Sequence, residues 1–364
     1  MRTASSRRLR FFMGLLGLIA AGGALLGSVL GQATPVNALV STIDALLIFG
    51  TIVAIEVFLP HTRHGRAFER SPFLVVFLVK SAVYLALIAL EVGFRAGRHL
   101  VTALIIAGNP FPVVAQLPPR LPLQIVMMIL TILIPFVVLV VQISRLVGEG
   151  TLRDIACGRY HRPRAEERFF LFVDVAGSTA LAERIGPSAA HRFLRRVFLL
   201  ASEAVDDHGG EIHQYVGDEM VVTWTLDEGA RGCAPVTCYF AIERALAAAA
   251  EEFRREFGAV PRLRAALHAG TVIAGEVGSS RRAIVFHGDV MNTTSRIEQA
   301  TRELDRPCLV SEDAVMRMDG KEAFEFSDLG EHRLRGRESP IRLFSVAPRI
   351  ESVGPPVAAL MPAK

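Results

Sequence analysis

The hydrophobic pattern divides the chain into a strongly apolar first part and a second part of mixed polarity. Four runs of largely apolar positions occupy the first part, at residues 11–31, 38–59, 73–94 and 121–147. A helix of about twenty apolar residues is long enough to cross a bilayer. The pattern therefore predicts an α-helical transmembrane domain with four spans over residues 1–147. A further apolar patch at 100–108 is too short to cross and is expected at the outer membrane interface.

From residue 169 onward, short β-rich runs alternate with amphipathic segments. Strands are predicted at 169–173, 212–216, 220–224, 263–268, 272–277, 283–286, around 309 and at 342–346. Helices are predicted at 187–208, 237–257 and 290–302. This order predicts an α+β domain with a largely antiparallel sheet covered by helices. We therefore expect four segments, which are the membrane part at 1–147, a polar connector at 148–168, a folded domain at 169–347 and a tail at 348–364.

The positions of arginine set the expected orientation of the membrane part. Basic residues precede the first apolar run and fill the loop after the second, namely Arg2, Arg7, Arg8, Arg10, Arg63, Arg66 and Arg70. Loops rich in Arg and Lys stay on the cytoplasmic side. With four crossings, the folded domain is cytoplasmic and the chain is a multi-pass protein of the cell (plasma or inner) membrane. A cleaved signal peptide is the alternative for 11–31, but that run is long and lacks a small-x-small exit.

Composition and charge narrow the class of protein. Hydrophobic residues make up 51% of the chain and the mean hydropathy is +0.38, which is too apolar for a purely soluble enzyme. Arginines close to the apolar runs account for most of the net charge of +4, so we expect no nucleic-acid partner. The cysteines lie on the predicted cytoplasmic side without metal-ligand spacing, and reduced thiols are expected at Cys157, Cys233, Cys238 and Cys308.

Two ionisable residues inside the apolar runs are expected to pair. Glu56 and Lys80 lie near the cytoplasmic ends of adjacent predicted spans. Charged groups are costly in hydrocarbon unless they are paired or reach the interface. We interpret them as a structural ion pair, with a sensor role as the alternative.

The candidate chemistry begins at residues 169–179, which read FFLFVDVAGST. An uninterrupted apolar run is typical of a strand buried on both faces, and this one ends at Asp174. Gly177 can adopt unusual backbone angles, and Ser178 or Thr179 can cap a following helix. The N–H groups of such a helix start suit a polyphosphate and its metal. The alternative is that Asp174 serves only as a helix cap.

A second acidic residue stands at the tip of the predicted hairpin. Two β-rich runs flank Gly217 and Asp218, so the hairpin can bring Asp218 toward Asp174, 44 positions earlier. Two carboxylates in one pocket repel each other unless cations lie between them. Paired divalent ions are the usual solution in phosphoryl chemistry. The alternative is an aspartate that serves the turn geometry alone.

Three motifs in this order resemble the catalytic domain of class III nucleotidyl cyclases. They are FVDVAGST at 172–179, VGDE at 216–219 and HGDVMNTTSRIE at 287–298. The resemblance covers roughly residues 165–347, about half of the chain. The resemblance implies a ferredoxin-like fold. It also implies that the protein is an adenylate cyclase, which is a lyase that acts in signal transduction. In this family the ribose 3′-hydroxyl of ATP attacks the α-phosphorus, which yields 3′,5′-cyclic AMP and pyrophosphate.

The resemblance also assigns roles to single residues. Asp174 and Asp218 are expected to hold two Mg²⁺ or Mn²⁺ ions per active site. Arg296 is expected to stabilise charge on the α-phosphoryl group and Asn292 to orient the ribose, although without the motif Arg296 reads as part of a surface charge pattern. The phosphates are expected to contact the turn after the first strand and a basic glycine turn, at Val175, Ala176, Gly177, Ser178, Thr179 and Arg337, with Arg335 as the alternative to Arg337.

In related enzymes, the metal-binding pair and the Asn/Arg pair of one site come from opposite subunits. This chain carries both sets, so the resemblance implies a homodimer through the catalytic domain with two equivalent composite sites.

The positions that read the base depart from the family pattern. The family's Lys and its Asp or Thr are replaced here by Gln214 and Val285. The Gln214 amide can donate to and accept from a purine edge, whereas Val285 cannot, which leaves a backbone group near Phe286. ATP is the expected substrate. The alternatives are GTP or relaxed purine specificity, and a catalytically silent nucleotide-binding homologue acting as a regulatory or pairing module. A diguanylate cyclase is disfavoured because 216–220 lack its double-Gly start and terminal Phe.

Overall fold

The computed structural model describes most of the second half of the chain and parts of the first. The described residues are 13, 17, 35–59, 62–69, 71–107, 132–143, 154–155, 157–279, 282–337 and 339–349. The chain divides into two compact units, Met1–Glu149 and Gly150–Lys364, called unit 1 and unit 2 below. The predicted span at 11–31 lies outside the described residues apart from Met13 and Gly17. Most of the predicted tail at 348–364 lies outside them as well.

The described part of unit 1 is almost entirely helical. Its labelled helices are α2 (Pro35–Phe58), α3 (Arg63–Glu69) and α4 (Phe73–Ala107), and a further apolar helix is Ile132–Ile143. The apolar patch at 100–108 is continuous with the preceding apolar run, because α4 extends without a break to Ala107. Its place at the outer membrane interface stays a prediction. Beyond residue 94, Gly97 is the strongest helix breaker in α4, and a single glycine weakens a helix without ending it.

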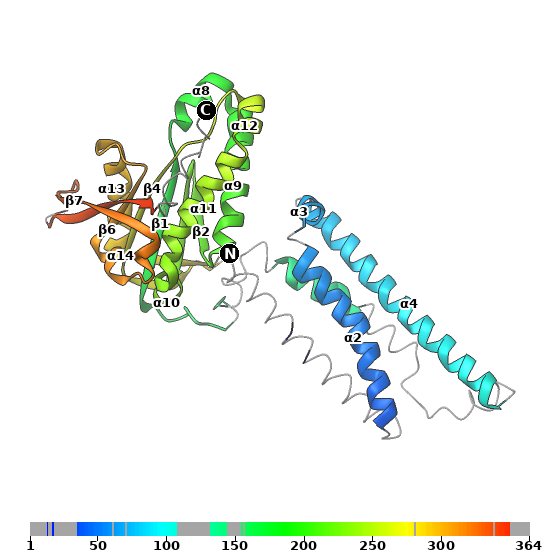
Figure 1. Cartoon of the computed structure of the whole chain (residues 1–364). Coiled ribbons are helices and arrows are strands. Elements are labelled where there is room, and N and C mark those ends of the chain that lie inside the picture. The colour runs from blue at the N-terminus through cyan, green and yellow to red at the C-terminus, as the bar shows by residue number, and fades with distance from the viewer. Residues whose placement is uncertain are drawn as a thin grey trace, which may run out of the picture. The chain divides into compact units, whose positions relative to one another are not determined.

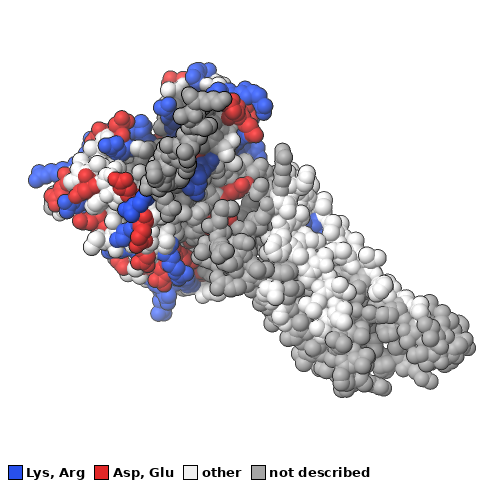
Figure 2. Space-filling view, in the orientation of Figure 1, with Lys and Arg blue, Asp and Glu red and all other residues white. Residues whose placement is uncertain are grey.

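The surface of unit 1 is apolar. On the face shown in Figure 2, its described surface is almost entirely white, whereas Lys, Arg, Asp and Glu are spread over unit 2. Large hydrophobic side chains are exposed along the helices, including Leu47, Leu74, Leu90, Phe94 and Ile132. Among the described residues, one helical stretch, Phe73–Leu90, is long and apolar enough to cross a membrane by length and composition, and Leu46–Phe58 is a shorter apolar helix.

A buried ion cluster joins the helices of unit 1. Lys80 is only 3% exposed, and its Nζ lies 3.0 Å from Glu56 Oε2 and 2.6 Å from Glu69 Oε1. The Tyr84 hydroxyl donates a hydrogen bond of 2.6 Å to Glu56. The expected pair of Glu56 and Lys80 is therefore present. The contact with Glu69, at the end of α3, was not foreseen from the sequence.

Unit 2 is built on one mixed sheet of eight strands. Their order is β2-β3-β1-β4-β6-β8-β7, and β5 pairs with β4. The strands are β1 (Arg164–Val175), β2 (Glu211–Val216), β3 (Glu219–Thr225), β4 (Leu263–Val277), β5 (Ala283–His287), β6 (Cys308–Ser311), β7 (Phe324–His332) and β8 (Ile341–Pro348). All neighbours are antiparallel except β4 and β6. The predicted α+β domain with a largely antiparallel sheet is confirmed.

Helices cover both faces of this sheet, with α9 and α11 side by side in Figure 1. The helices are α8 (Ser178–Ile185), α9 (Pro187–Asp207), α10 (Leu226–Ala230), α11 (Ala234–Ala248), α12 (Ala250–Phe257), α13 (Asp289–Glu303) and α14 (Glu312–Arg317), with 3-10 turns at Arg231–Cys233 and Lys321–Ala323. Side chains alternate between the faces of a strand, so Phe169 packs with α9 and α11 residues while Phe170 packs with Val290 of α13. The expectation that the first strand is buried on both faces is correct.

Several predicted boundaries differ from the structure. β1 begins at Arg164, so the end of the predicted connector at 148–168 is strand. The predicted strands at 263–268 and 272–277 are one strand, β4. The predicted helix at 237–257 is two helices that meet at Ala249, whose φ and ψ of −93° and 2° are not helical.

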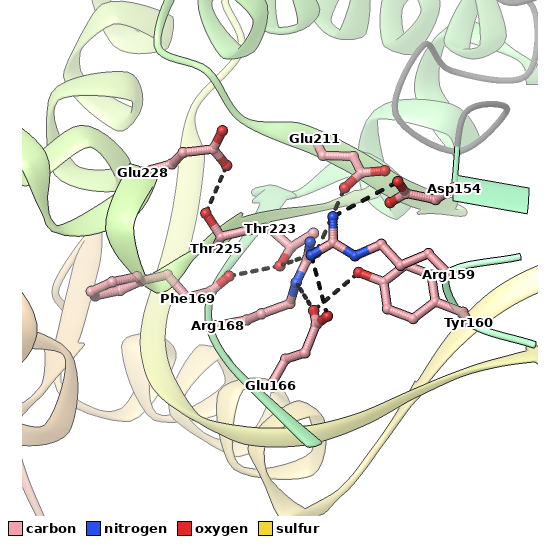
Figure 3. A network of polar contacts seen from close by, with 10 residues as sticks. All are labelled: Asp154, Arg159, Tyr160, Glu166, Arg168, Phe169, Glu211, Thr223, Thr225 and Glu228. Atoms are coloured by element: carbon pink, nitrogen blue, oxygen red, sulfur yellow. Dashed lines mark hydrogen bonds and ion pairs between the residues drawn. The ribbon is translucent and has the colours of Figure 1, made fainter. Parts of the chain in front are cut away.

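The segment before β1 is tied to the sheet by the polar network in Figure 3. Arg168 is 5% exposed, and its guanidinium lies 3.3 Å from Glu166, 3.4 Å from the Thr223 hydroxyl and 3.6 Å from Glu211. The buried Tyr160 donates a hydrogen bond of 3.0 Å from its hydroxyl to Glu166. Residues just before the first strand are therefore part of the folded unit.

Candidate active site

Asp174 and Asp218 lie side by side. Asp174 is next to the last residue of β1, and it pairs in register with Glu219, the first residue of β3. The tight connection at Gly217 and Asp218 joins β2 to β3, with Gly217 in the left-handed region at φ 64°. The Val175 N–H donates to the Asp218 carbonyl at 3.3 Å. The hairpin thus brings together the two aspartates that the sequence singled out.

Two more carboxylates join them. Glu219 follows Asp218 directly, and Glu298, which is 6% exposed, lies on α13. These four side chains, Asp174, Asp218, Glu219 and Glu298, are called the acidic cluster below. Burial, followed by the charge of Asp218, raises the pKa of Asp174 to about 6. Burial, followed by the charges of Glu298, Asp174 and Asp218, raises the pKa of Glu219 to about 7.

One arginine faces the acidic cluster. The Nη2 of Arg302, near the end of α13, lies 3.4 Å from Asp174 Oδ2 and 3.5 Å from Glu298 Oε1. The other contacts of Asp174 with charged groups are repulsive and come from carboxylates. A site with this excess of negative charge favours a bound cation.

The arrangement suits a cation that is shared with a ligand. Among the described residues, no three His, Cys, Asp or Glu side chains are grouped so that they could hold a metal by themselves. Mg²⁺ commonly takes one or two carboxylates from the protein and completes its shell with water and substrate phosphates. Asp174 and Asp218 fit that mode of binding.

The turn after β1 departs from its predicted role in part. The sequence predicts Ser178 or Thr179 as the cap of the next helix, but α8 begins at Ser178 after a left-handed Gly177, and no side chain caps it. The Ser178 hydroxyl instead donates a hydrogen bond to the Asp218 carboxylate. The N–H groups of Val175 and Ala176 are bonded to carbonyls of the protein, and Ala176 donates to Arg262 at 2.8 Å. Phosphate contacts through these two amides are therefore disfavoured.

The first turn of α8 keeps its N–H groups available. The opening N–H groups of a helix have no partner inside the helix. Here they adjoin a hollow lined by Ser178, Thr179, Gly217, Asp218 and apolar residues of α8 and α9. The part of the turn that can receive an anion is therefore Gly177 to Thr179.

Arg296 of the third motif lies close to the basic glycine turn at residues 335–337. Asn292 and Arg296 lie one turn apart on α13. The Arg296 guanidinium comes within 3.5 Å of the position that a Cβ at Gly336 would take. Arg337 donates a hydrogen bond of 2.7 Å to the Thr293 hydroxyl, and the same guanidinium lies 3.5 Å from Asp289. Of the two candidate arginines, Arg337 is the one held against α13, whereas Arg335 is exposed.

The two halves of the expected site are separate within one chain. Across the described part of the chain, no hydrogen bond or ion pair joins Asn292 or Arg296 to Asp174 or Asp218. The α13 residue that contacts Asp174 is Arg302, which lies six positions beyond Arg296, or roughly 9 Å along the helix. The sequence analysis gives no role to Glu298, the last residue of the third motif, or to Arg302, which lies one helical turn further along α13.

The expected base-reading strand carries a β-bulge. The register between β2 and β3 shifts between Ile212 and Gln214, and Gln214 stands opposite Val221. Val221 belongs to the apolar cluster that contains Phe286, whose ring is 8% exposed. The His213 ring lies 4.9 Å from the Phe286 ring. The Phe286 side chain is therefore part of the core, and only its backbone is suited to contact a base.

The comparisons with known proteins agree on the second half of the chain. "Adenylate cyclase 2" of Rhizobium meliloti (strain 1021) is 39% identical over 210 residues, which cover 58% of this chain and 58% of that protein. An "Adenylate cyclase" of Anabaena cylindrica is 29% identical over 182 residues, or 48% of this chain and 36% of that protein. The chain thus spans less than two thirds of the length of these relatives.

A solved structure and a family profile cover the same region. The adenylyl cyclase CyaB from P. aeruginosa aligns with 53% of this chain and 100% of its own, at 19% identity and a TM-score of 0.46, a likeness too low to carry an argument. The profile described as "Adenylate and Guanylate cyclase catalytic domain" matches residues 161–347, about half of the chain and all of the motifs described above. With the acidic cluster at the end of β1 and the Asn/Arg pair on α13 in place, the chain belongs to the adenylate and guanylate cyclase catalytic-domain family.

Proposed function

We propose that this protein is a membrane-anchored adenylate cyclase that converts ATP to 3′,5′-cyclic AMP and pyrophosphate. The observation that carries the proposal is the meeting of Asp174 and Asp218 in a buried, negatively charged site of a cyclase-family domain. The relative with 39% identity, which is named an adenylate cyclase, supports the choice of reaction.

Asp174 and Asp218 would hold Mg²⁺ or Mn²⁺, two ions in each active site. When bound, such ions lower the pKa of the attacking 3′-hydroxyl and offset the charge of the phosphates. Ser178 holds the Asp218 carboxylate in place through its hydrogen bond. The N–H groups at Gly177 to Thr179 lie beside the same carboxylate and receive the β- and γ-phosphates.

Asn292, Arg296 and Arg337 would act on the sugar and phosphates. The Asn292 amide orients the ribose by hydrogen bonding. Arg296 stabilises the negative charge that develops on the α-phosphoryl group, which is the role of a preorganised guanidinium in phosphoryl transfer. Arg337 supplies a second guanidinium for the triphosphate, and Thr293 and Asp289 hold its orientation.

The active unit would be a homodimer. Within one chain, the acidic cluster and the Asn/Arg pair do not contact each other in the described structure. The α13 arginine next to Asp174 is Arg302 and not Arg296. Two copies related by a two-fold axis could place the pair of one subunit opposite the cluster of the other, which creates two equivalent sites. A single subunit would then be inactive.

ATP is the proposed substrate, and GTP is the alternative to be tested. Gln214 pairs with Val221 across the sheet, and its exposed side-chain amide can reach a purine edge. An amide can rotate to match either purine, so Gln214 permits ATP without excluding GTP.

Unit 1 would anchor the protein in a cell (plasma or inner) membrane. The exposed apolar residues along α2 and α4 form a surface that suits hydrocarbon and not water. Four spans would leave unit 2 in the cytoplasm, as the arginine bias favours. Among the described residues, Phe73–Leu90 is long and apolar enough to be one of these spans, and the shorter apolar helices Leu46–Phe58 and Ile132–Ile143 overlap two others.

The direct test is turnover by the full-length protein in detergent micelles. With Mn²⁺ and ATP, we expect formation of cyclic AMP and pyrophosphate in equal amounts, detected by mass spectrometry. Asp174→Asn should reduce the rate at least about a hundredfold, because it removes a metal ligand. No cyclic AMP above the level of that variant would overturn the proposal.

The departures at Gln214 and Val285 favour one second candidate, a cyclase homologue that binds nucleotide without converting it. Binding of ATP with no cyclic product from either ATP or GTP would support it.

A further inference from the structure

We propose that Arg302 is a positioning residue that competes with divalent cations for the acidic cluster and so sets the metal affinity of the nucleotide-free enzyme. The proposal concerns the same carboxylates as the proposed function and rests on it. It assigns a role to a residue that lies outside the sequence motifs.

The Arg302 guanidinium contacts two carboxylates in the way that a bound cation would. Its Nη2 lies between two carboxylates, 3.4 Å from Asp174 and 3.5 Å from Glu298. Both carboxylate side chains are only 8% exposed. A buried carboxylate is costly unless a charge or hydrogen bond compensates it. Arg302 supplies that charge at Asp174.

The Arg302 side chain is free to move away from the two carboxylates. Its side chain is 57% exposed, in contrast to the carboxylates that it faces. At 3.4 and 3.5 Å, both contacts are longer than the roughly 2.7–2.9 Å of a strong charge-assisted hydrogen bond. An arginine side chain that is more than half exposed and has long contacts can move into solvent without opening the core.

Displacement follows from the charges. A divalent cation on Asp174 and a guanidinium on the same carboxylate repel each other, so each weakens the binding of the other. Metal binding therefore weakens the contact between Arg302 and Asp174, and the free energy lost from that contact is subtracted from the free energy of metal binding. While the site holds no metal, the same contact keeps Asp174 near its binding position.

The experiment measures Mn²⁺ binding to the full-length protein in detergent micelles without nucleotide, from the loss of the free-Mn²⁺ electron paramagnetic resonance signal. We expect Arg302→Gln to bind Mn²⁺ at least about threefold more tightly than the wild type, the size of effect that a half-exposed ion pair allows. Arg302→Met, which keeps the aliphatic stem, should behave in the same way, and Arg302→Lys should stay close to the wild type.

The matched control is Arg306→Gln, which removes the same charge from an exposed position just beyond α13. It should change the affinity less than Arg302→Gln does, and Asp174→Asn should abolish the tighter binding. Unchanged or weaker binding in both Arg302→Gln and Arg302→Met would overturn the proposal, as would equal effects of the Arg302 and Arg306 substitutions. Absence of saturable Mn²⁺ binding in all variants would overturn it too. Because no turnover is measured, failure of the proposed reaction is distinguished from failure of this inference.

Discussion

The Ser178 hydroxyl donates a hydrogen bond to the carboxylate of Asp218, 40 positions later in the chain. The bond links the start of α8 to the tip of the β2–β3 hairpin, so the turn proposed to bind phosphate and the aspartate proposed to bind metal are connected directly. Residues that orient a metal ligand in this way usually matter nearly as much as the ligand itself.

Ser178→Ala should therefore weaken metal-dependent turnover without unfolding the domain. We expect a loss of about ten- to a hundredfold in kcat/KM, together with a higher Mn²⁺ requirement. Ser188→Ala, at an exposed position near the start of α9, is the matched control. Rates of the two variants within twofold of each other would show that the hydrogen bond has no such role.

Gln214→Lys should move the enzyme toward ATP. A lysine at this position of β2 can only donate, which suits N1 of adenine, an acceptor, and not N1 of guanine, which carries a hydrogen. The Gln214 amide presents both a donor and an acceptor. One gained or lost hydrogen bond to a base is worth about tenfold in relative kcat/KM. Competition between ATP and GTP measures the ratio, with Gln214→Leu as the control. A ratio unchanged in both variants would remove Gln214 from base recognition.

His268 should make the protein sensitive to mild acid. Burial lowers the pKa of His268 to about 4, and its Nδ1 lies 2.7 Å from the Ser311 hydroxyl. The unfolded chain protonates this histidine near pH 6.5, so between pH 6.5 and 4 the unfolded state binds more protons and stability falls as the pH falls. The loss from this group is up to about 3 kcal/mol at pH 4.

His268→Leu removes that contribution. Its unfolding free energy should fall less steeply than that of the wild type from pH 6.5 to 4, whatever the absolute stability of the variant. Denaturant unfolding at several pH values gives the two slopes, and equal slopes would contradict the prediction.

Lys80→Met should destabilise unit 1. The substitution removes the cation that Glu56 and Glu69 share in a buried place, and breaking such a pair from one side costs about 3 kcal/mol or more. Thermal unfolding in detergent should show the loss. The double variant Lys80→Met/Glu56→Gln should recover part of it, because it removes one of the two carboxylates. A double variant less stable than the single one would argue against the shared-cation interpretation.

The acidic pair could be foreseen because its signals are local. An apolar run that ends in Asp174 predicts a strand end, and a Gly-Asp turn between two β-rich runs predicts a hairpin tip. Antiparallel pairing of β1 with β3 then places Asp174 opposite Glu219, next to Asp218. Arg302 could not be foreseen in the same way. Its contact with Asp174 spans 128 positions and depends on how far α13 extends across the sheet, which no short pattern encodes.

The predicted strand and helix boundaries that differ from the structure also depend on contacts between distant segments of the chain. The sequence Ala-Gly-Thr at 269–271 was read as a break, yet β4 continues through it because β1 pairs along its length. Gly270 lies where α13 packs closely, and a Cβ there would be 2.9 Å from Val290. The glycine is therefore explained by a neighbouring helix and not by a turn. The break at Ala249 has no signal in a run of good helix formers.

Complementation between two inactive variants tests the central claim, that a working site combines the acidic cluster of one subunit with Asn292 and Arg296 of another. Asp218→Asn and Arg296→Ala should each be inactive in the full-length protein. When they are co-expressed, random pairing makes half of the dimers mixed, and each mixed dimer contains one intact site. Cyclic AMP production should then return to about one quarter of the wild-type rate. A mixture as inactive as its two parents, or full activity of either variant alone, would contradict the account.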